Sequence, residues 1–200
     1  MKDAKLAIKH GVDALGLVFY EASPRNVTIQ QAIEIATAIP PFVTLVGLFV
    51  NAESSFIEEV IAKVSLNLIQ FHGDETQAEC LRYKLPFIKA IRVKQDTNLI
   101  QYSADFPQAK ALLLDAYAEG VAGGTGLVFD WQLIPPNLTK PIILAGGLNA
   151  ENVSNAIRKV KPYAVDISGG VEMSKGIKDA AKIAAFMQQV ESVNVEEVEN

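Results

Sequence analysis

The sequence contains little of what several classes of protein require. Its 200 residues include one cysteine, Cys80, which excludes an internal disulfide and a multi-cysteine metal site, so we expect a cytoplasmic protein. The two histidines, His10 and His72, are too few for a histidine-based metal site. No apolar run reaches the roughly 18 residues of a membrane span, and no basic run accompanies the net charge of −5. We therefore expect neither a membrane nor a nucleic-acid partner.

Short apolar runs alternate with amphipathic segments along almost the whole chain. Continuous apolar runs are typical of parallel strands buried on both faces, and the segments between them are typical of crossover helices. Strands are expected at residues 14–19, 43–50, 68–71, 87–93, 111–115, 141–145 and 164–167. Helices are expected at residues 29–38 with Thr28 as N-cap, 55–63, from 75 onward, 98–103, 150–159 and 178–190.

About seven β/α repeats of this kind fit either an open doubly wound sheet or a closed barrel. No G-x-G-x-x-G follows an early strand, which disfavours dinucleotide binding. We expect one α/β barrel domain over residues 1–190 and an acidic C-terminal tail over residues 191–200. Residues 1–10 predict a helix, and no strand precedes it.

Glycines gather after the two late strands. Gly146 and Gly147 follow one of them, and Ser168, Gly169 and Gly170 follow the next. Glycine lets backbone N–H groups approach an anion closely, and loops at this place form the recurring phosphate site of such barrels. The alternative is that these glycines only make tight turns, but two groups on consecutive strands favour phosphate binding.

Four polar side chains lie at or near the carboxyl ends of the predicted strands, where a barrel of this kind opens to solvent. Asp115 ends an apolar strand and is either a general acid or the cap of the next turn, and the glycine-rich segment 122–126 behind it favours the acid. Asp166, expected inside the last strand, is either a hydrogen-bonding hub or a substrate contact. His72 is either a pocket wall or a cap. Arg25 is either a partner for a carboxylate or phosphate, or a surface residue.

Seven motifs occur in one order along nearly the whole chain, and together they resemble the phosphoribosylanthranilate isomerase family. They are G-x-D-A-L-G-x-V-F at 11–19, S-P-R at 23–25, Q-F-H-G-D-E at 70–75, L-L-D-A at 113–116, G-G-T-G-x-x-F-D-W at 123–131, L-A-G-G-L at 144–148 and V-D-I-S-G-G-V-E at 165–172.

The resemblance implies a phosphate-binding (β/α)8 barrel and a role in tryptophan biosynthesis. It implies an Amadori rearrangement of N-(5-phosphoribosyl)anthranilate to 1-(2-carboxyphenylamino)-1-deoxyribulose 5-phosphate, without a cofactor or metal. It makes Asp115 the general acid and puts Arg25, His72 and Asp166 in the substrate pocket. It also makes the loops that contain Gly146, Gly147 and residues 168–170 the phosphate grip.

The start of the chain differs from the family pattern. The family's base is a cysteine on a first strand that precedes a helix like residues 1–10, and Cys80 belongs to a different helix. We therefore expect an N-terminally truncated chain that lacks the first strand, folds poorly alone and has no isomerase activity. Gly169 where the family usually has serine, and Lys175 where proline is common, are smaller departures.

Two other functions remain open at this point. A related phosphate barrel, indole-glycerol-phosphate synthase, needs a catalytic lysine at a strand end, and Lys89 and Lys94 are the candidates. Alternatively, the chain is a non-catalytic phosphate-binding fragment. The sequence leaves the oligomeric state undetermined.

Overall fold

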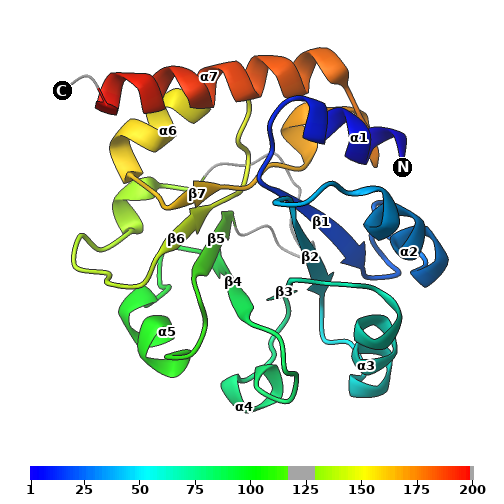
Figure 1. The fold of residues 1–200 in the computed structure, drawn as a ribbon. Helices are drawn as coiled ribbons and strands as arrows, with labels where there is room; N and C mark the ends of the chain where they lie inside the picture. The colour runs from blue at the N-terminus through cyan, green and yellow to red at the C-terminus, as the bar shows by residue number, and fades with distance from the viewer. Residues whose placement is uncertain (117–128, 199–200) are drawn as a thin grey trace. The chain divides into compact units, whose positions relative to one another are not determined.

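The computed structural model describes residues 1–116 and 129–198, and it divides into two compact units. The first consists of Met1–Ala90 and Gln108–Lys110, and the second of Ile91–Pro107 and Ala111–Asn200. Strand β4 (Phe87–Val93) runs from the first unit into the second. The parallel strands follow the order β1-β2-β3-β4-β5-β6-β7, so the sheet order is the chain order (Figure 1).

The first unit pairs parallel strands in a regular register, from Ala14↔Thr44 on β1 and β2 to Phe71↔Lys89 on β3 and β4. Its helix starts are fixed by local chemistry, because Thr28 and Gln31 form a reciprocal capping box at α2, and Thr76 and Glu79 form another at α4. The elements are α1 (Lys2–Lys9), β1 (Ala14–Phe19), α2 (Ile29–Ala38), β2 (Thr44–Phe49), α3 (Ser54–Lys63), β3 (Leu68–Phe71) and α4 (Gln77–Cys80).

Aromatic and branched side chains fill the interior of this unit. The rings of Phe19 and Phe49, from β1 and β2, stack with centroids 5.2 Å apart, and Phe56 of α3 contacts both at their edges. The rings of Phe19 and Phe49 are therefore buried between β1, β2 and α3.

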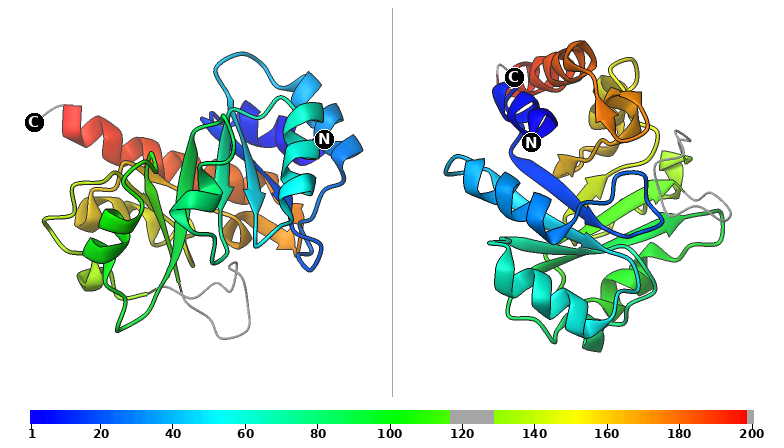
Figure 2. Two further views of the ribbon diagram at one scale, coloured as in Figure 1. Left: turned by 90° about the horizontal axis from the view of Figure 1, so that it is seen from below. Right: turned by 90° about the vertical axis from the view of Figure 1, so that its right-hand side faces the viewer.

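The second unit contains the parallel strands β5, β6 and β7 and the helices α5, α6 and α7. The helices α6 and α7 lie side by side (Figures 1 and 2), and the Ser154 hydroxyl donates to the Gln189 carbonyl oxygen at 3.1 Å. Its elements are α5 (Leu99–Asp105), β5 (Leu112–Ala116), η1 (Trp131–Leu133), β6 (Ile142–Leu144), α6 (Val153–Val160), β7 (Ala164–Val165), η2 (Gly169–Val171), β8 (Glu172–Ser174), β9 (Ile177–Lys178) and α7 (Ala180–Val198).

The strand–helix alternation expected from the sequence is present, with four differences. β7 ends at Val165, so Asp166 follows the strand and is exposed, where a position inside the strand was expected. Helix α4 begins at Gln77 and is a single turn. An antiparallel hairpin, β8–β9, precedes α7 and was not expected. Helix α7 continues past residue 190, the expected boundary of the tail, to Val198. The glycine-rich segment 122–126 lies outside the described residues.

Candidate active site

The two glycine-rich loops of the second unit line one cavity of about 180 Å³. The first loop follows β6 and the second follows β7, so consecutive parallel strands deliver both to the same edge of the sheet. Asp115, at the end of the neighbouring strand β5, lines the same cavity. The lining residues are Asp115, Ala145, Gly146, Gly147, Leu148, Asn149, Asp166, Ile167, Ser168, Gly169 and Gly170.

At two of these positions, close contacts leave no room for a side chain larger than that of glycine. Gly146 has a φ of +82°, and a Cβ there would lie 2.8 Å from Asp115 Oδ1 and against the Ala116 backbone nitrogen. A Cβ on Gly170 would overlap the Leu148 carbonyl oxygen of the first loop. Glycine therefore lets the two loops and the β5 carboxyl group pack closely around the cavity.

Neighbouring polar side chains hold both loops in place. The Asn152 amide donates to the Gly147 carbonyl oxygen at 3.0 Å, while Asn149 and Asn152 accept from each other's backbone N–H groups. On the second loop, the Lys178 ammonium group donates to the Ser168 carbonyl oxygen at 2.8 Å and to Glu172 Oε1 at 3.0 Å. Sequence reasoning missed these residues. The N-x-x-N spacing before α6 was the signal that could have identified the first pair.

The two acidic residues of the cavity differ in environment. Asp115 is 5% exposed, and its Oδ1 accepts a hydrogen bond from the Ala116 backbone N–H at 2.8 Å. Asp166 is exposed, and its backbone N–H donates to the Leu144 carbonyl oxygen at 2.8 Å. The buried carboxyl group of Asp115 is therefore the better placed of the two to exchange a proton with a bound molecule.

The other two expected site residues belong to the first unit. His72 directly follows β3 and is 7% exposed, and its Nδ1 lies 2.9 Å from the amide nitrogen of Gln70. Arg25 is half-buried in the loop after β1, and its backbone N–H donates to Ser23 Oγ at 3.2 Å.

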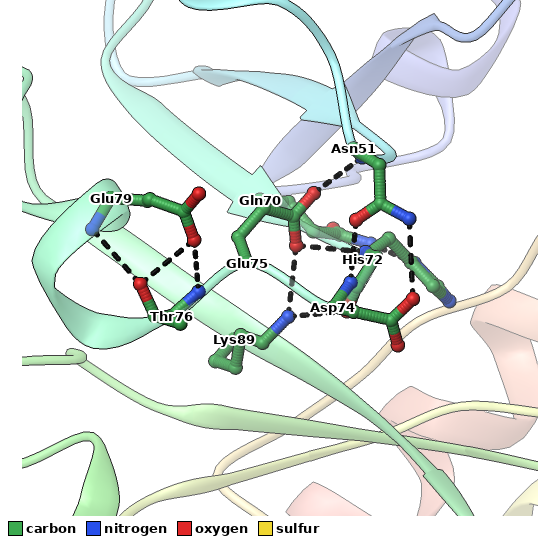
Figure 3. Close-up of polar contacts among 9 residues, drawn as sticks. Asn51, Gln70, His72, Asp74, Glu75, Thr76, Glu79 and Lys89 are labelled. Atoms are coloured by element: carbon green, nitrogen blue, oxygen red, sulfur yellow. Dashed lines mark hydrogen bonds and ion pairs between the residues drawn. The ribbon is translucent and has the colours of Figure 1, made fainter.

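A buried ion pair stabilises the loop that carries His72 (Figure 3). Lys89 Nζ lies 2.9 Å from Glu75 Oε2 and donates to the Gly73 carbonyl oxygen at 2.6 Å. Glu75 also accepts from the backbone N–H groups of Gly73, at 2.9 Å, and Asn51, at 2.7 Å. The pair ties the turn after β2 to the turn after β3. Lys94, the other candidate lysine, is 54% exposed beside Asp96.

Cys80 does not have the properties of a catalytic base. It lies on α4 with no exposed surface. Burial raises the pKa of its thiol to about 12, against an ordinary value of 9.0, so the thiol stays protonated at neutral pH. Elsewhere in the described part of the chain, no group of three or more His, Cys, Asp or Glu side chains could hold a metal ion. Within residues 1–116 and 129–198, no helix is long and apolar enough to cross a membrane.

Glycine loops that follow consecutive parallel strands and enclose a small cavity are typical of α/β enzymes that bind phosphorylated molecules. The family model described as N-(5'-phosphoribosyl)anthranilate (PRA) isomerase matches residues 1–189. The chain is 58% identical over 190 residues to N-(5'-phosphoribosyl)anthranilate isomerase of Pseudomonas fluorescens (strain Pf0-1), covering 95% of this chain and 93% of the relative. The chain belongs to this isomerase family.

Solved structures of the family have a fold similar to that of this chain. Phosphoribosyl anthranilate isomerase from Thermotoga maritima superimposes with a TM-score of 0.85 and 36% identity, over 96% of this chain and 94% of that one. A family structure in complex with reduced 1-(o-carboxyphenylamino)-1-deoxyribulose 5-phosphate gives a TM-score of 0.82 and 36% identity, over 96% and 93%. The fold is therefore the α/β TIM-barrel-like fold of the family. The coverage is near full and does not support the expected truncation.

Proposed function

We propose that this protein is a phosphoribosylanthranilate isomerase of tryptophan biosynthesis, with Asp115 as its general acid. The observation that carries the proposal is that a buried carboxyl group and two glycine-rich loops line one cavity. The loops offer backbone N–H groups to a phosphate, which leaves the reacting end of a phosphorylated sugar within reach of Asp115. A family member binds the reduced product analogue, a phosphorylated molecule of this type.

The reaction then begins with two proton transfers. Asp115 donates a proton to the furanose ring oxygen, the bond from that oxygen to C1 breaks, and the nitrogen lone pair forms an iminium ion. A base removes the C2 proton, and the electrons of that C–H bond neutralise the iminium nitrogen to give an enolamine. The enolamine tautomerises to the ketone. A carboxylic acid held in a largely buried position suits the first transfer.

The remaining expected residues are assigned to substrate binding. The loops of Gly146, Gly147 and residues 168–170 bind the phosphate, and Asp166 lines the same cavity. Arg25 binds the anthranilate carboxylate, because a guanidinium group can form a bidentate ion pair with it. His72 contributes a further polar contact with the substrate.

The substitution Asp115→Asn tests the acid. It keeps the shape of the side chain but removes the acidic proton, so we expect kcat to fall by about two orders of magnitude or more. Asp105→Asn is the matched control, since Asp105 is an exposed residue at the end of α5. Turnover of Asp115→Asn close to that of the control would show that Asp115 is not the acid.

Whether the 200-residue chain itself turns over is a separate question. The expectation of inactivity was based on the lack of a cysteine like the family's base, and Cys80, whose pKa burial raises to about 12, is unsuited to replace it. Turnover by this chain as it stands would contradict that expectation. Thermal shift with the reduced product against inorganic phosphate then distinguishes an isomerase site, which stabilises the protein more with the former, from a generic phosphate site.

A further inference from the structure

The most informative polar contact outside the cavity is the buried pair formed by Gln70 and His72 (Figure 3). Residues two apart on a strand point to the same side, so β3 places Gln70 beside the histidine that follows its last residue. Both residues are 7% exposed, and Gln70 Nε2 lies 2.9 Å from His72 Nδ1. A hydrogen bond at this depth in the protein constrains the chemistry of both groups.

The two nitrogen atoms can form this bond in one way. An amide nitrogen only donates, so Nδ1 of the imidazole must accept and therefore carries no proton. The neutral ring then carries its proton on Nε2.

The backbone around His72 is fixed independently of its ring. The His72 N–H donates to the Phe49 carbonyl oxygen at 2.8 Å, and the next residue, Gly73, is bonded on both sides by Glu75 and Lys89. These bonds position the backbone, but they do not select which ring nitrogen carries the proton. The contact with Gln70 is the one that can determine which ring nitrogen of His72 carries the proton.

We propose that Gln70 is a positioning residue that holds His72 as the neutral Nε2–H tautomer, so that His72 presents an N–H donor to an oxygen of the substrate. This inference rests on the proposed function for the role of His72 in substrate binding. An N–H donor suits the carboxylate and hydroxyl oxygens of a phosphorylated anthranilate sugar, all of which accept hydrogen bonds.

Nitrogen-15 NMR of histidine-labelled protein tests the tautomer directly. The chain has two histidines, so His10→Gln assigns both spin systems. In the unsubstituted chain at neutral to mildly basic pH, we expect a protonated Nε2 and an unprotonated Nδ1 at His72. In Gln70→Glu the carboxylate accepts instead, so Nδ1 becomes protonated. In Gln70→Met both tautomers appear.

Kinetics give a second readout. In Gln70→Glu we expect KM to rise by about tenfold or more, the loss of one hydrogen bond to a charged group, while kcat changes far less. Gln30→Met, at an exposed position on α2, is the control for the loss of a glutamine and should change neither the NMR pattern nor KM.

The outcomes separate the two proposals. A protonated Nδ1 in the unsubstituted chain, or an unchanged Nε2–H pattern in both Gln70 variants, would overturn the inference even if the protein is fully active. An inactive protein that shows the expected tautomer would overturn the proposed function and leave the inference intact. The spectrum of the unsubstituted chain needs no variant to fold.

Discussion

Replacing Lys89 with methionine tests whether a buried charge pair holds the loop after β3. The side chains of Lys89 and Glu75 are 3% and 8% exposed, and their charged atoms lie 2.9 Å apart. Methionine keeps the apolar stem of lysine but removes the ammonium group. Glu75 then loses its cationic partner, and the Gly73 carbonyl oxygen loses the hydrogen bond that Lys89 donates at 2.6 Å.

The expected loss of stability depends on the hydrogen bonds that Glu75 retains in the variant. Removing one partner of a buried ion pair costs about 3–5 kcal/mol, because the other charge stays buried. Glu75 retains hydrogen bonds from the backbone N–H groups of Asn51 and Gly73, which offset part of that cost. We therefore expect Lys89→Met to lower the free energy of unfolding by about 3 kcal/mol, or the melting temperature by roughly 6–12 °C.

Urea unfolding of a double-mutant cycle measures this. Glu75→Gln alone should cost about as much as Lys89→Met, while the double variant should cost clearly less than the sum, because it leaves no uncompensated charge. Lys63→Met is the matched control, since Lys63 and Glu59 are 53% and 47% exposed in their ion pair, and such surface pairs contribute about 0.5 kcal/mol or less. Equal losses for Lys89→Met and Lys63→Met, or strict additivity in the cycle, would refute the reasoning.

Two further predictions concern Gly146 and Cys80. Gly146→Ala forces a Cβ against Ala116 at a φ of +82°, so it should lower stability by about 1–3 kcal/mol and also reduce kcat/KM; Gly16→Ala, where a Cβ meets nothing within 4 Å, should leave kcat/KM unchanged. The pKa of Cys80 is raised from 9.0 to about 12 in the folded chain, so its contribution to stability is complete below pH 9 and is lost as pH rises towards 12. The free energy of unfolding should therefore fall by up to about 1.4 kcal/mol per pH unit above pH 9, and Cys80→Ala should lack that slope in alkaline urea titrations.

The bounds of β1, β3 and β4 agree with the sequence prediction residue for residue, while β2 is one residue shorter at each end than predicted. β1 is a continuous apolar run, and β3 and β4 are mostly apolar with one or two polar residues each, which is the pattern of parallel strands in the interior of a sheet. The β8–β9 hairpin was missed because its strands are two or three residues long and include the exposed Met173 and Ser174. The start of α4 was placed two residues early, although the T-x-x-E capping box at Thr76 marks it.

The candidate site also has parts that the sequence could predict and parts that it could not. The meeting of the two glycine-rich loops at one cavity could be predicted because each loop directly follows a parallel strand, and neighbouring strands end at the same edge of the sheet. Their phosphate binding stays a prediction. The contacts around His72 depend on partners from different turns, since Glu75 bonds Asn51, 24 residues earlier, and Lys89, 14 residues later. Sequence patterns of period two or 3.6 carry no information about such pairs.

The sequence nevertheless contained one signal for the contacts around His72. Lys89 interrupts the apolar run F-I-K-A-I-R-V, and a lysine buried in a strand requires an anionic partner. The sequence interpretation considered Lys89 only as a catalytic lysine. The ion pair gives it a different role, because an ammonium group bonded to both Glu75 and the Gly73 carbonyl oxygen stabilises the turn that carries His72 and is not available as a nucleophile. A lysine buried inside a strand therefore indicates a nearby acidic partner before it indicates a catalytic amine, and here that acid, Glu75, lies in the turn that directly follows His72.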